Sequence, residues 1–477
     1  MNSIQRIGRN LIALSFSYFA VAILSMFLSI FIARLLGDID LGKYYIAITL
    51  PQLFLIFLDL GYETYIIREV ARNKLLASKY LSNAFTFRLL LIPIIISMIL
   101  ISVNLLGYPE NTKYLVYLFS IYYIFSSLSS IIKMTFRAFE KMGYEAIINI
   151  FISFLRILLG LLFLYLGYGL ITLALIFIFS GILEFIITFL VCRKKFFKPK
   201  LEIDISFIKK SIKISLPLAI VTLFGLIYVK IDTVMLSYMK GDAVVGWYNA
   251  AYSLTLGFNP IPLLIMNALL PVLSYSYISS KESLKMAYEK SFKYLFYLSL
   301  PLAIGIFMLA DGIIFIFYGD EFVNSIVALK ILAWDILLKF LYLCSAYILV
   351  ATNKQKQMTI IVIATALLNI ILNLFLIPSY SYIGSGIATL ITEFFLLVIY
   401  LYINALDSII PNIKKFLFQP IIASGVMAYF LWQFPGIQLV LKILIAIFIY
   451  FALLIVLKGF SREDFQIFRQ LIKKGEN

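Results

Sequence analysis

Residues 37–44 read Gly-Asp-Ile-Asp-Leu-Gly-Lys-Tyr, and residues 241–248 read Gly-Asp-Ala-Val-Val-Gly-Trp-Tyr. The Ala47 and Leu50 that follow the first copy recur after the second copy at the same spacing. A gap-free match at one constant offset indicates that the chain is internally duplicated. In a very apolar chain, duplication is typical of membrane transporters.

The composition is that of a membrane protein. Of the 477 residues, 63% are hydrophobic, and the mean hydropathy is +1.02. Soluble domains are only about 45–50% apolar. The net charge of +16 would suggest nucleic acid if the basic residues formed one surface of a soluble domain. They lie between hydrophobic runs instead, so no nucleic-acid partner is expected.

The chain has no histidine, and Cys192 and Cys344 are its only cysteines. These counts exclude a histidine general base, most catalytic zinc sites and a disulfide framework. No outer loop is long enough to hold a soluble catalytic domain. We therefore expect no catalytic residues, no metal and no cofactor, and we expect a transporter rather than an enzyme.

The hydrophobic runs predict an all-α integral membrane protein. A helix crosses about 30 Å of hydrocarbon with roughly 20 apolar residues. About fourteen runs meet this length, near 11–33, 44–62, 85–106, 114–132, 146–166, 171–191, 216–236, 244–273, 294–317, 328–351, 358–378, 383–402, 416–433 and 438–457. The first run is too long for a signal peptide and is expected to stay as a membrane helix.

The order of the spans predicts four regions. Residues 1–191 form an N-lobe of six helices, 192–215 a basic cytoplasmic connector, 216–402 a C-lobe of six helices, and 403–477 two further helices with a tail. Six spans return the chain to its starting side, so the two lobes have the same orientation.

Basic residues retained on the cytoplasmic side set the orientation. Most Lys and Arg, Arg88 and Lys133 among them, fall in segments that are cytoplasmic if the N-terminus is inside. We predict a multi-pass protein of the cytoplasmic (cell) membrane with both termini in the cytoplasm. The connector and the basic tail after residue 460 show amphipathic patterns, typical either of interfacial helices on anionic lipid or of ordinary charge retention with helical linkers.

Several stretches, taken in order, resemble one family. They are Ala33-Arg34-Leu35-Leu36-Gly37, Gly42-Lys43-Tyr44, Asp59-Leu60-Gly61-Tyr62 with Arg68, residues 136–142, Ile231-Asp232 and residues 245–252. The chain is similar to prokaryotic polysaccharide transporters, the Wzx-like O-antigen or oligosaccharide flippases. These belong to the MATE-related multidrug/oligosaccharidyl-lipid/polysaccharide (MOP) superfamily.

The resemblance implies a fold and a function. It implies two pseudo-symmetric six-helix lobes around a cavity that opens alternately inward and outward. The substrate would be a polyprenyl-diphosphate-linked oligosaccharide, such as an O-antigen or another surface polysaccharide repeat unit, moved from the cytoplasmic to the outer leaflet. Membrane lipid is the other partner, turnover is expected to couple to H+ or Na+, and one chain is expected to suffice.

Charged residues inside spans are candidates for function because a charge in the bilayer is costly without a partner or a wet cavity. We predict substrate-binding cations at Arg34, Arg156, Lys230 and Lys339, ion-coupling or charge-pair acids at Asp59, Glu184, Asp232, Asp335 and Glu393, and helix hinges at Pro51, Pro260 and Pro262.

Some of these candidates have two interpretations. Arg156 is equally compatible with gripping a diphosphate and with pairing to Glu184 in the neighbouring span. Asp335 and Lys339 are four residues apart on one helix face, which favours mutual neutralisation. Glu393 is a candidate for proton or sodium coupling, or for a structural pair with a lysine.

The two halves of the chain can also be compared for their charged residues. Glu184-Phe185 recurs as Glu393-Phe394 at nearly the offset of the opening motif. Arg156, Lys230 and Lys339, by contrast, show no basic counterpart in the other half. Lys230 and Asp232 are two residues apart and should point in different directions. Function is thus expected to lie in the asymmetric charges.

The opening motif itself is interpreted as structural. We expect its glycines to form a tight outer turn and to allow close approach of helices. Its Asp is expected to cap a helix, and its Tyr to lie in the aromatic belt.

Three alternatives to a polysaccharide flippase remain. A lipid II-type flippase would share the fold and the diphosphate substrate. A MATE-like cation or drug exporter would need acidic rather than basic cavity residues. A membrane glycosyltransferase or polymerase would need a large outer loop, which the span assignment lacks.

Overall fold

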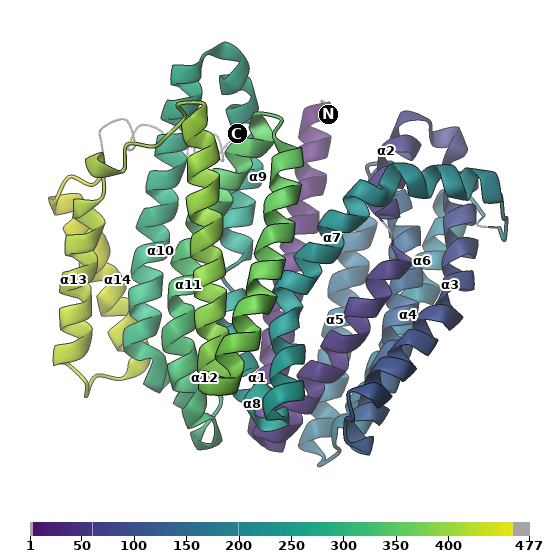
Figure 1. Cartoon of the computed structure of the whole chain (residues 1–477), viewed down its shortest axis with the longest axis horizontal. Coiled ribbons are helices and arrows are strands. Elements are labelled where there is room, and N and C mark those ends of the chain that lie inside the picture. Colours follow the sequence, from purple (N-terminus) through teal and green to yellow (C-terminus); the bar gives the residue numbers. More distant parts are fainter. Residues whose placement is uncertain (1–2, 60, 199, 461–477) are drawn as a thin grey trace. The chain divides into compact units, whose positions relative to one another are not determined.

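The computed structural model describes residues 3–59, 61–198 and 200–460, and these residues contain α- and 3-10 helices but no β-strand. The fourteen α-helices (Figure 1) are α1 (Ser3–Leu55), α2 (Tyr62–Arg72), α3 (Ala77–Leu105), α4 (Glu110–Ala138), α5 (Met142–Tyr165), α6 (Leu170–Lys195), α7 (Ile205–Lys240), α8 (Asp242–Leu256), α9 (Pro260–Ser279), α10 (Lys281–Phe317), α11 (Val323–Ala351), α12 (Gln355–Leu406), α13 (Phe418–Gln433) and α14 (Leu439–Val456). The predicted all-α fold is confirmed.

Ten helical segments of the described chain are long and apolar enough to cross a membrane. Two of them, Ala13–Leu58 and Gln355–Leu406, contain a backbone break and correspond to two predicted spans each. Helix α11 (29 residues) and the shorter α13 (16 residues) are not among these ten segments. Together these segments account for the fourteen predicted spans.

The chain packs as two compact units. Unit 1 comprises Met1–Gly257 with Val362–Ala388, and unit 2 comprises Phe258–Ile361 with Thr389–Asn477. The core of unit 2 is built from buried aromatic and aliphatic side chains such as Tyr288, Phe292 and Phe340. The predicted division into two six-helix lobes with a 192–215 connector stays a prediction. The predicted amphipathic tail falls in residues 461–477, outside the described residues.

The opening motif forms the same backbone break twice. Gly37 interrupts α1 with φ 82° and ψ −175°, and Gly241 separates α7 from α8 with φ 89° and ψ 178°. Such positive-φ backbone is essentially restricted to glycine. The predicted glycine turns are therefore confirmed at both positions.

The two copies of the motif also pack against each other within unit 1. A Cβ atom on Gly42 would lie 1.8 Å from the carbonyl oxygen of Asp242, and one on Gly246 would lie 2.1 Å from that of Asp38. Trp247 Nε1 donates a hydrogen bond of 2.7 Å to Asp38 Oδ2. The contact is reciprocal, as expected for two copies related by approximate two-fold symmetry.

Two expectations for the motif are wrong. Gly241, and not Asp242, occupies the N-cap position of α8, and its cap lacks a side-chain hydrogen bond. Tyr44 and Tyr248 are buried inside unit 1 rather than placed in an aromatic belt. Both differences have one cause, because the close backbone contact places these residues inside a helix interface.

The span predicted at 44–62 ends earlier than expected. Helix α1 contains Pro51 and ends at Leu55, a 3-10 turn follows, and the separate amphipathic α2 begins at Tyr62 after the left-handed Gly61. The span predicted at 244–273 is likewise two helices, because α8 ends at Leu256 and α9 begins with Pro260. Proline at the first helical position loses no helical hydrogen bond, so Pro260 starts a helix rather than bending one.

The connector runs along α3 before α7 begins. The backbone N–H groups of Lys200, Glu202 and Asp204 donate to side chains of Ser82, Thr86 and Asn83 on α3. The first part of α7 then runs across the top of the view in Figure 1 before the helix turns down. This start of α7 has exposed apolar residues beside exposed lysines, as an interfacial segment would.

Candidate functional site: two buried charge clusters

Unit 1 holds a buried cluster on three helices, which we call the N-cluster: Lys133 on α4, Arg156 on α5 and Glu184 on α6. Lys133 Nζ lies 2.5 Å from Glu184 Oε1 and 2.6 Å from Asn149 Oδ1. The nearest Arg156 nitrogen lies 3.9 Å from Glu184 Oε2. Two cations thus share one carboxylate, and the N-cluster carries a formal charge of +1.

Aromatic rings hold the guanidinium of Arg156. Its central carbon lies 4.7 Å from the ring centre of Tyr122 and 4.8 Å from that of Phe177, within cation–π range. Its Nε donates a hydrogen bond of 2.9 Å to Ser180 Oγ. The predicted proximity of Arg156 and Glu184 is present, but Lys133 is the closer partner of that carboxylate.

Unit 2 holds a second buried cluster, which we call the C-cluster: Asp335 and Lys339 on α11 with Glu393 on α12. Lys339 Nζ lies 2.9 Å from Asp335 Oδ2 and 3.6 Å from Glu393 Oε1. The three residues are 1%, 7% and 1% exposed. Two carboxylates share one ammonium, so the C-cluster carries a formal charge of −1.

The two clusters contain the same duplicated pair. Glu184 and Glu393 are matched by the repeat in the sequence. Glu184 forms an ion pair with Lys133, and Glu393 forms one with Lys339. The expectation that Lys339 lacks a basic counterpart is therefore wrong. Lys133 was assigned to a cytoplasmic loop because the apolar run ends at residue 132, whereas α4 continues to Ala138.

Asp232 lies in a third polar group, on α7 of unit 1. Its carboxylate accepts hydrogen bonds from Tyr248 Oη at 2.9 Å and from Asn373 Nδ2 at 2.7 Å. The same amide nitrogen lies 3.0 Å from Asn369 Oδ1. This group therefore gathers several oxygen atoms around one buried carboxylate.

Lys230 lies two residues before Asp232 on α7. Its side chain is half-buried on α7. Among the residues that the structure describes, its ammonium has neither an ion pair nor a hydrogen bond. An amine in this state is suited to receive an anion from outside the chain.

Arg34 and Asp59, the remaining predicted charged residues, are not members of these clusters. Arg34 is exposed on α1, three residues before the break at Gly37. Asp59 Oδ1 lies 3.2 Å from Arg88, whose guanidinium also donates to the carbonyl of Leu58 and to the Ser130 hydroxyl. Arg88 is buried, although the sequence placed it with the cytoplasmic basic residues.

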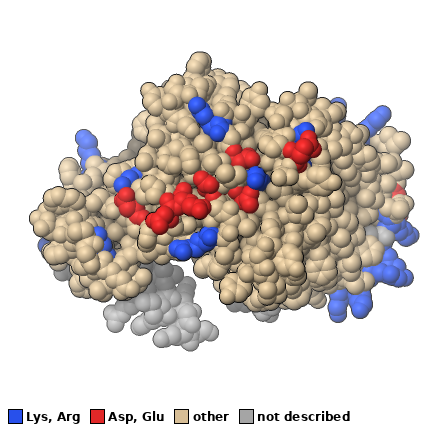
Figure 2. Space-filling model, turned by 90° about the horizontal axis from the view of Figure 1, so that it is seen from below, with Lys and Arg blue, Asp and Glu red and all other residues tan. Residues whose placement is uncertain are grey.

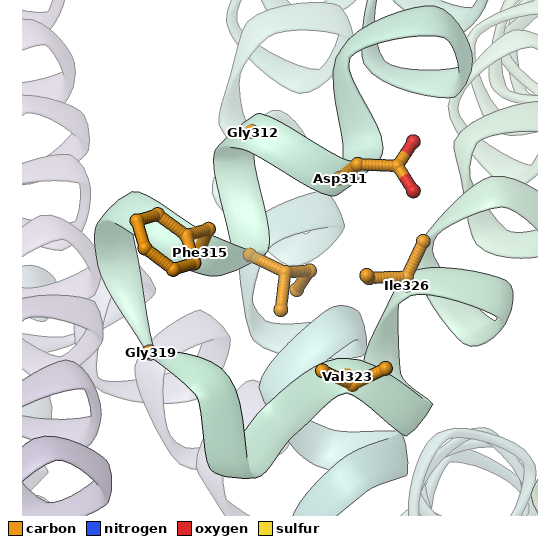
Figure 3. A pocket seen from close by; sticks show the side chains of 7 residues that line it. Asp311, Gly312, Phe315, Gly319, Val323 and Ile326 are labelled. Atoms are coloured by element: carbon orange, nitrogen blue, oxygen red, sulfur yellow. The ribbon is translucent and has the colours of Figure 1, made fainter.

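A cavity of about 350 Å³ lies in unit 2, lined by Asp311, Gly312, Ile314, Phe315, Gly319, Val323 and Ile326. Figure 3 shows Phe315 and Ile326 on opposite sides of it, with the Asp311 carboxylate near Ile326. Asp311 pairs with Lys330 at 2.9 Å. The lining is mainly apolar and includes no predicted substrate-binding residue.

Uncharged residues form most of the face seen in Figure 2, and several Asp and Glu side chains gather on it. In the chain as a whole, 13% of the residues are charged.

The fold matches solved transporters of the MOP superfamily. The lipid II flippase MurJ in an inward closed conformation aligns with a TM-score of 0.80 and 20% identity, over 94% of this chain and 99% of that one. An inward-facing multidrug resistance MATE family transporter aligns at 0.67 and 17%, over 81% and 96%. At these identities the likeness shows the fold alone, an all-helical fold shared with these multi-pass transporters.

The family follows from the sequence matches. The polysaccharide biosynthesis protein family model matches residues 7–276, and the chain belongs to this family. The MatE model matches residues 217–375. The predicted resemblance is confirmed.

A named relative is the probable low-salt glycan biosynthesis flippase Agl15 of Haloferax volcanii. It is 25% identical over 232 residues, which are 47% of this chain. The match spans 48%, about half, of that relative's length. The relative and the structural neighbours are flippases and transporters by name, not enzymes.

Proposed function

We propose that the protein is a flippase that moves a polyprenyl-diphosphate-linked oligosaccharide from the cytoplasmic to the outer leaflet by alternating access. The observation that carries this proposal is the surplus of positive charge on membrane helices of unit 1, in the N-cluster and at Lys230. A diphosphate is an anion that cationic groups in a low-dielectric site hold strongly. Membership of a polysaccharide biosynthesis family supports a glycan cargo.

The predicted substrate-binding cations differ in their pairing. Lys230 is the strongest candidate because no partner of its ammonium is found in the described chain. Arg156 is the more loosely paired cation of the N-cluster, at 3.9 Å from Glu184. Arg34 is exposed and suited to a late contact on the outer side. Lys339 is held between two carboxylates, which favours a charge-pair role.

Coupling to a cation is part of the proposal. Sodium, a hard cation, prefers oxygen ligands, and the group around Asp232 gathers carboxylate and amide oxygens. Protons need only a carboxyl group, and the C-cluster supplies two. We further propose that the protein lies in the cytoplasmic membrane with both termini inside, and that one chain suffices.

Vesicles containing the purified protein test the function. A fluorescent polyprenyl-diphosphate oligosaccharide is added, and the fraction shielded from an external quencher is measured over time. We expect Lys230→Ala to slow flipping at least about tenfold, while Lys230→Arg keeps the charge and most of the rate. Lys281→Ala, which changes an exposed residue at the start of α10, serves as the matched control.

Two outcomes would contradict the proposal. No flipping of any polyprenyl-diphosphate glycan by the wild-type protein would reject the function itself. Unchanged flipping in both Lys230→Ala and Arg156→Ala would remove these cations from the substrate site while leaving the function.

A lipid II-type flippase is the second candidate, because the MurJ fold aligns over nearly the whole chain. The same vesicles with fluorescent lipid II separate the two substrates. Deletion of the gene separates them in cells, since lysis favours lipid II and loss of one surface glycan in viable cells favours the polysaccharide role. A MATE-like cation exporter would instead transport organic cations in the vesicles.

A further inference from the structure

We propose that the C-cluster is a proton-binding site, in which Asp335 and Glu393 together hold one proton beside Lys339. This inference deepens the proposed transport function by assigning the coupling ion and its site.

The C-cluster has one more negative than positive group. The C-cluster contains two carboxylates and one ammonium, each less than 10% exposed, on helices α11 and α12. A net charge buried at membrane depth costs several kcal/mol, whereas a neutral group does not. One proton bound to a carboxylate oxygen brings the formal charge from −1 to zero.

One carboxylate oxygen of Asp335 is buried without a hydrogen-bond partner among the described residues. Asp335 Oδ2 accepts from Lys339, but Asp335 Oδ1 is fully buried and has no hydrogen-bond partner among the described residues. A buried acceptor without a donor pays the full cost of desolvation. A proton bound to this carboxyl group removes the charge that makes this cost large.

The position of Lys339 favours a proton over a metal ion. Its ammonium already stands between the carboxylates, 2.9 Å from Asp335 and 3.6 Å from Glu393. A sodium ion bridging the same oxygens would have to displace this cation or meet its repulsion. A proton binds to a carboxylate oxygen and leaves the ammonium in place.

Two tyrosines and the helices that pack on α11 surround the C-cluster. Tyr342 on α11 and Tyr400 on α12 interact electrostatically with Glu393, and their ring centres lie 6.3 Å apart. Helix α9, which packs on α11, has no charged residue. On α10, Asp311 pairs with Lys330, while Tyr288 shares a hydrogen bond with the Ser345 hydroxyl.

The N-cluster shows why only one copy of the duplicated pair needs a proton. There the Lys–Glu pair is joined by the cation Arg156, so the carboxyl group of Glu184 lies within ion-pair distance of two cations. In the C-cluster the third member is the acid Asp335. Loss of the proton leaves a buried net charge, so the protonated and deprotonated states favour different packing of α11 against α12.

Infrared spectroscopy of the purified protein in lipid tests the site without any substrate. At neutral pH we expect a carbonyl band from one buried protonated carboxyl group in the wild type. Asp335→Asn and Glu393→Gln each neutralise the cluster without a proton, so each alone removes this band. Glu184→Gln is the matched control at the equivalent position and leaves the band unchanged.

Further measurements keep the test decisive. A wild-type spectrum without a protonated carboxyl band at neutral pH overturns the proposal, as does a band that persists in both single variants. A melting temperature for each variant shows that it is folded, and Asp335→Asn is the conservative choice because its shape is unchanged. If the band is present but no glycan is flipped, the proton site stands and the proposed function fails. If glycan is flipped but the band is absent, the proposed function stands and the proton site fails.

Discussion

The N-cluster and the C-cluster each contain a lysine–glutamate pair, but the third member differs between them. Lys133 and Glu184 in unit 1 correspond to Lys339 and Glu393 in unit 2, but Arg156 joins the first pair and Asp335 the second. The formal charge is +1 for the N-cluster and −1 for the C-cluster.

This difference suggests a division of labour. A positive cluster attracts an anion such as a diphosphate, whereas a negative cluster attracts a proton or another cation. The repeat is thus symmetric where it packs, at Gly42 and Gly246, and asymmetric where it is charged. The sign of each cluster should therefore decide how the stability of the protein responds when one of its charges is removed.

Removing the lysine of each cluster should give the largest difference. Lys339→Met leaves two buried carboxylates with no cation in the cluster, a loss of about 3–5 kcal/mol of stability, whereas Lys133→Met leaves Glu184 with Arg156 and costs about 1–2 kcal/mol. Thermal unfolding of the purified protein in detergent measures both. Equal losses would mean that Arg156 does not compensate Glu184.

Neutralising an acid should have opposite effects in the two clusters. Glu184→Gln leaves two buried cations without a carboxylate and should cost roughly 2–3 kcal/mol. Asp335→Asn removes the surplus charge of the C-cluster and should be neutral or stabilising, most clearly at alkaline pH. Melting temperatures of the two variants at pH 7 and pH 9 provide the comparison. A comparable loss in Asp335→Asn would contradict a surplus negative charge there.

The packing contact should respond equally in both copies. Gly42→Ala and Gly246→Ala each place a methyl group against a backbone carbonyl that cannot move aside, at a cost of about 1–3 kcal/mol. Gly143→Ala is the matched control, because a Cβ there meets nothing within 4 Å. Unfolding temperatures that fall in only one of the two variants would argue against a symmetric contact.

The sequence predicted the spans and both repeated glutamates, because hydropathy and repetition are local properties. It missed Lys133, since the hydropathy run ends at residue 132 while α4 continues to Ala138. It also grouped Arg88 with the cytoplasmic residues, although Arg88 lies near the start of the span predicted at 85–106 and inside α3. The partners of these cations lie on other helices, and their burial depends on tertiary packing. The contact between Gly42 and Asp242 could not be predicted from the sequence either, because it joins segments about 200 residues apart.

The smallest effect is expected at an exposed pair, which contrasts with both clusters. Backbone hydrogen bonding from Phe207 and then the Lys79 ammonium, 3.1 Å away, hold the pKa of Asp204 below its ordinary value. A carboxyl whose folded pKa is lowered stabilises the protein above its unfolded pKa of about 3.9, and this contribution is lost as the pH falls through the folded pKa. Asp204→Asn should therefore lower the melting temperature slightly at pH 7 and not at pH 2–3, with Glu202→Gln as the control. A shift as large as that of Glu184→Gln would mean that burial is not what separates the clusters from surface pairs.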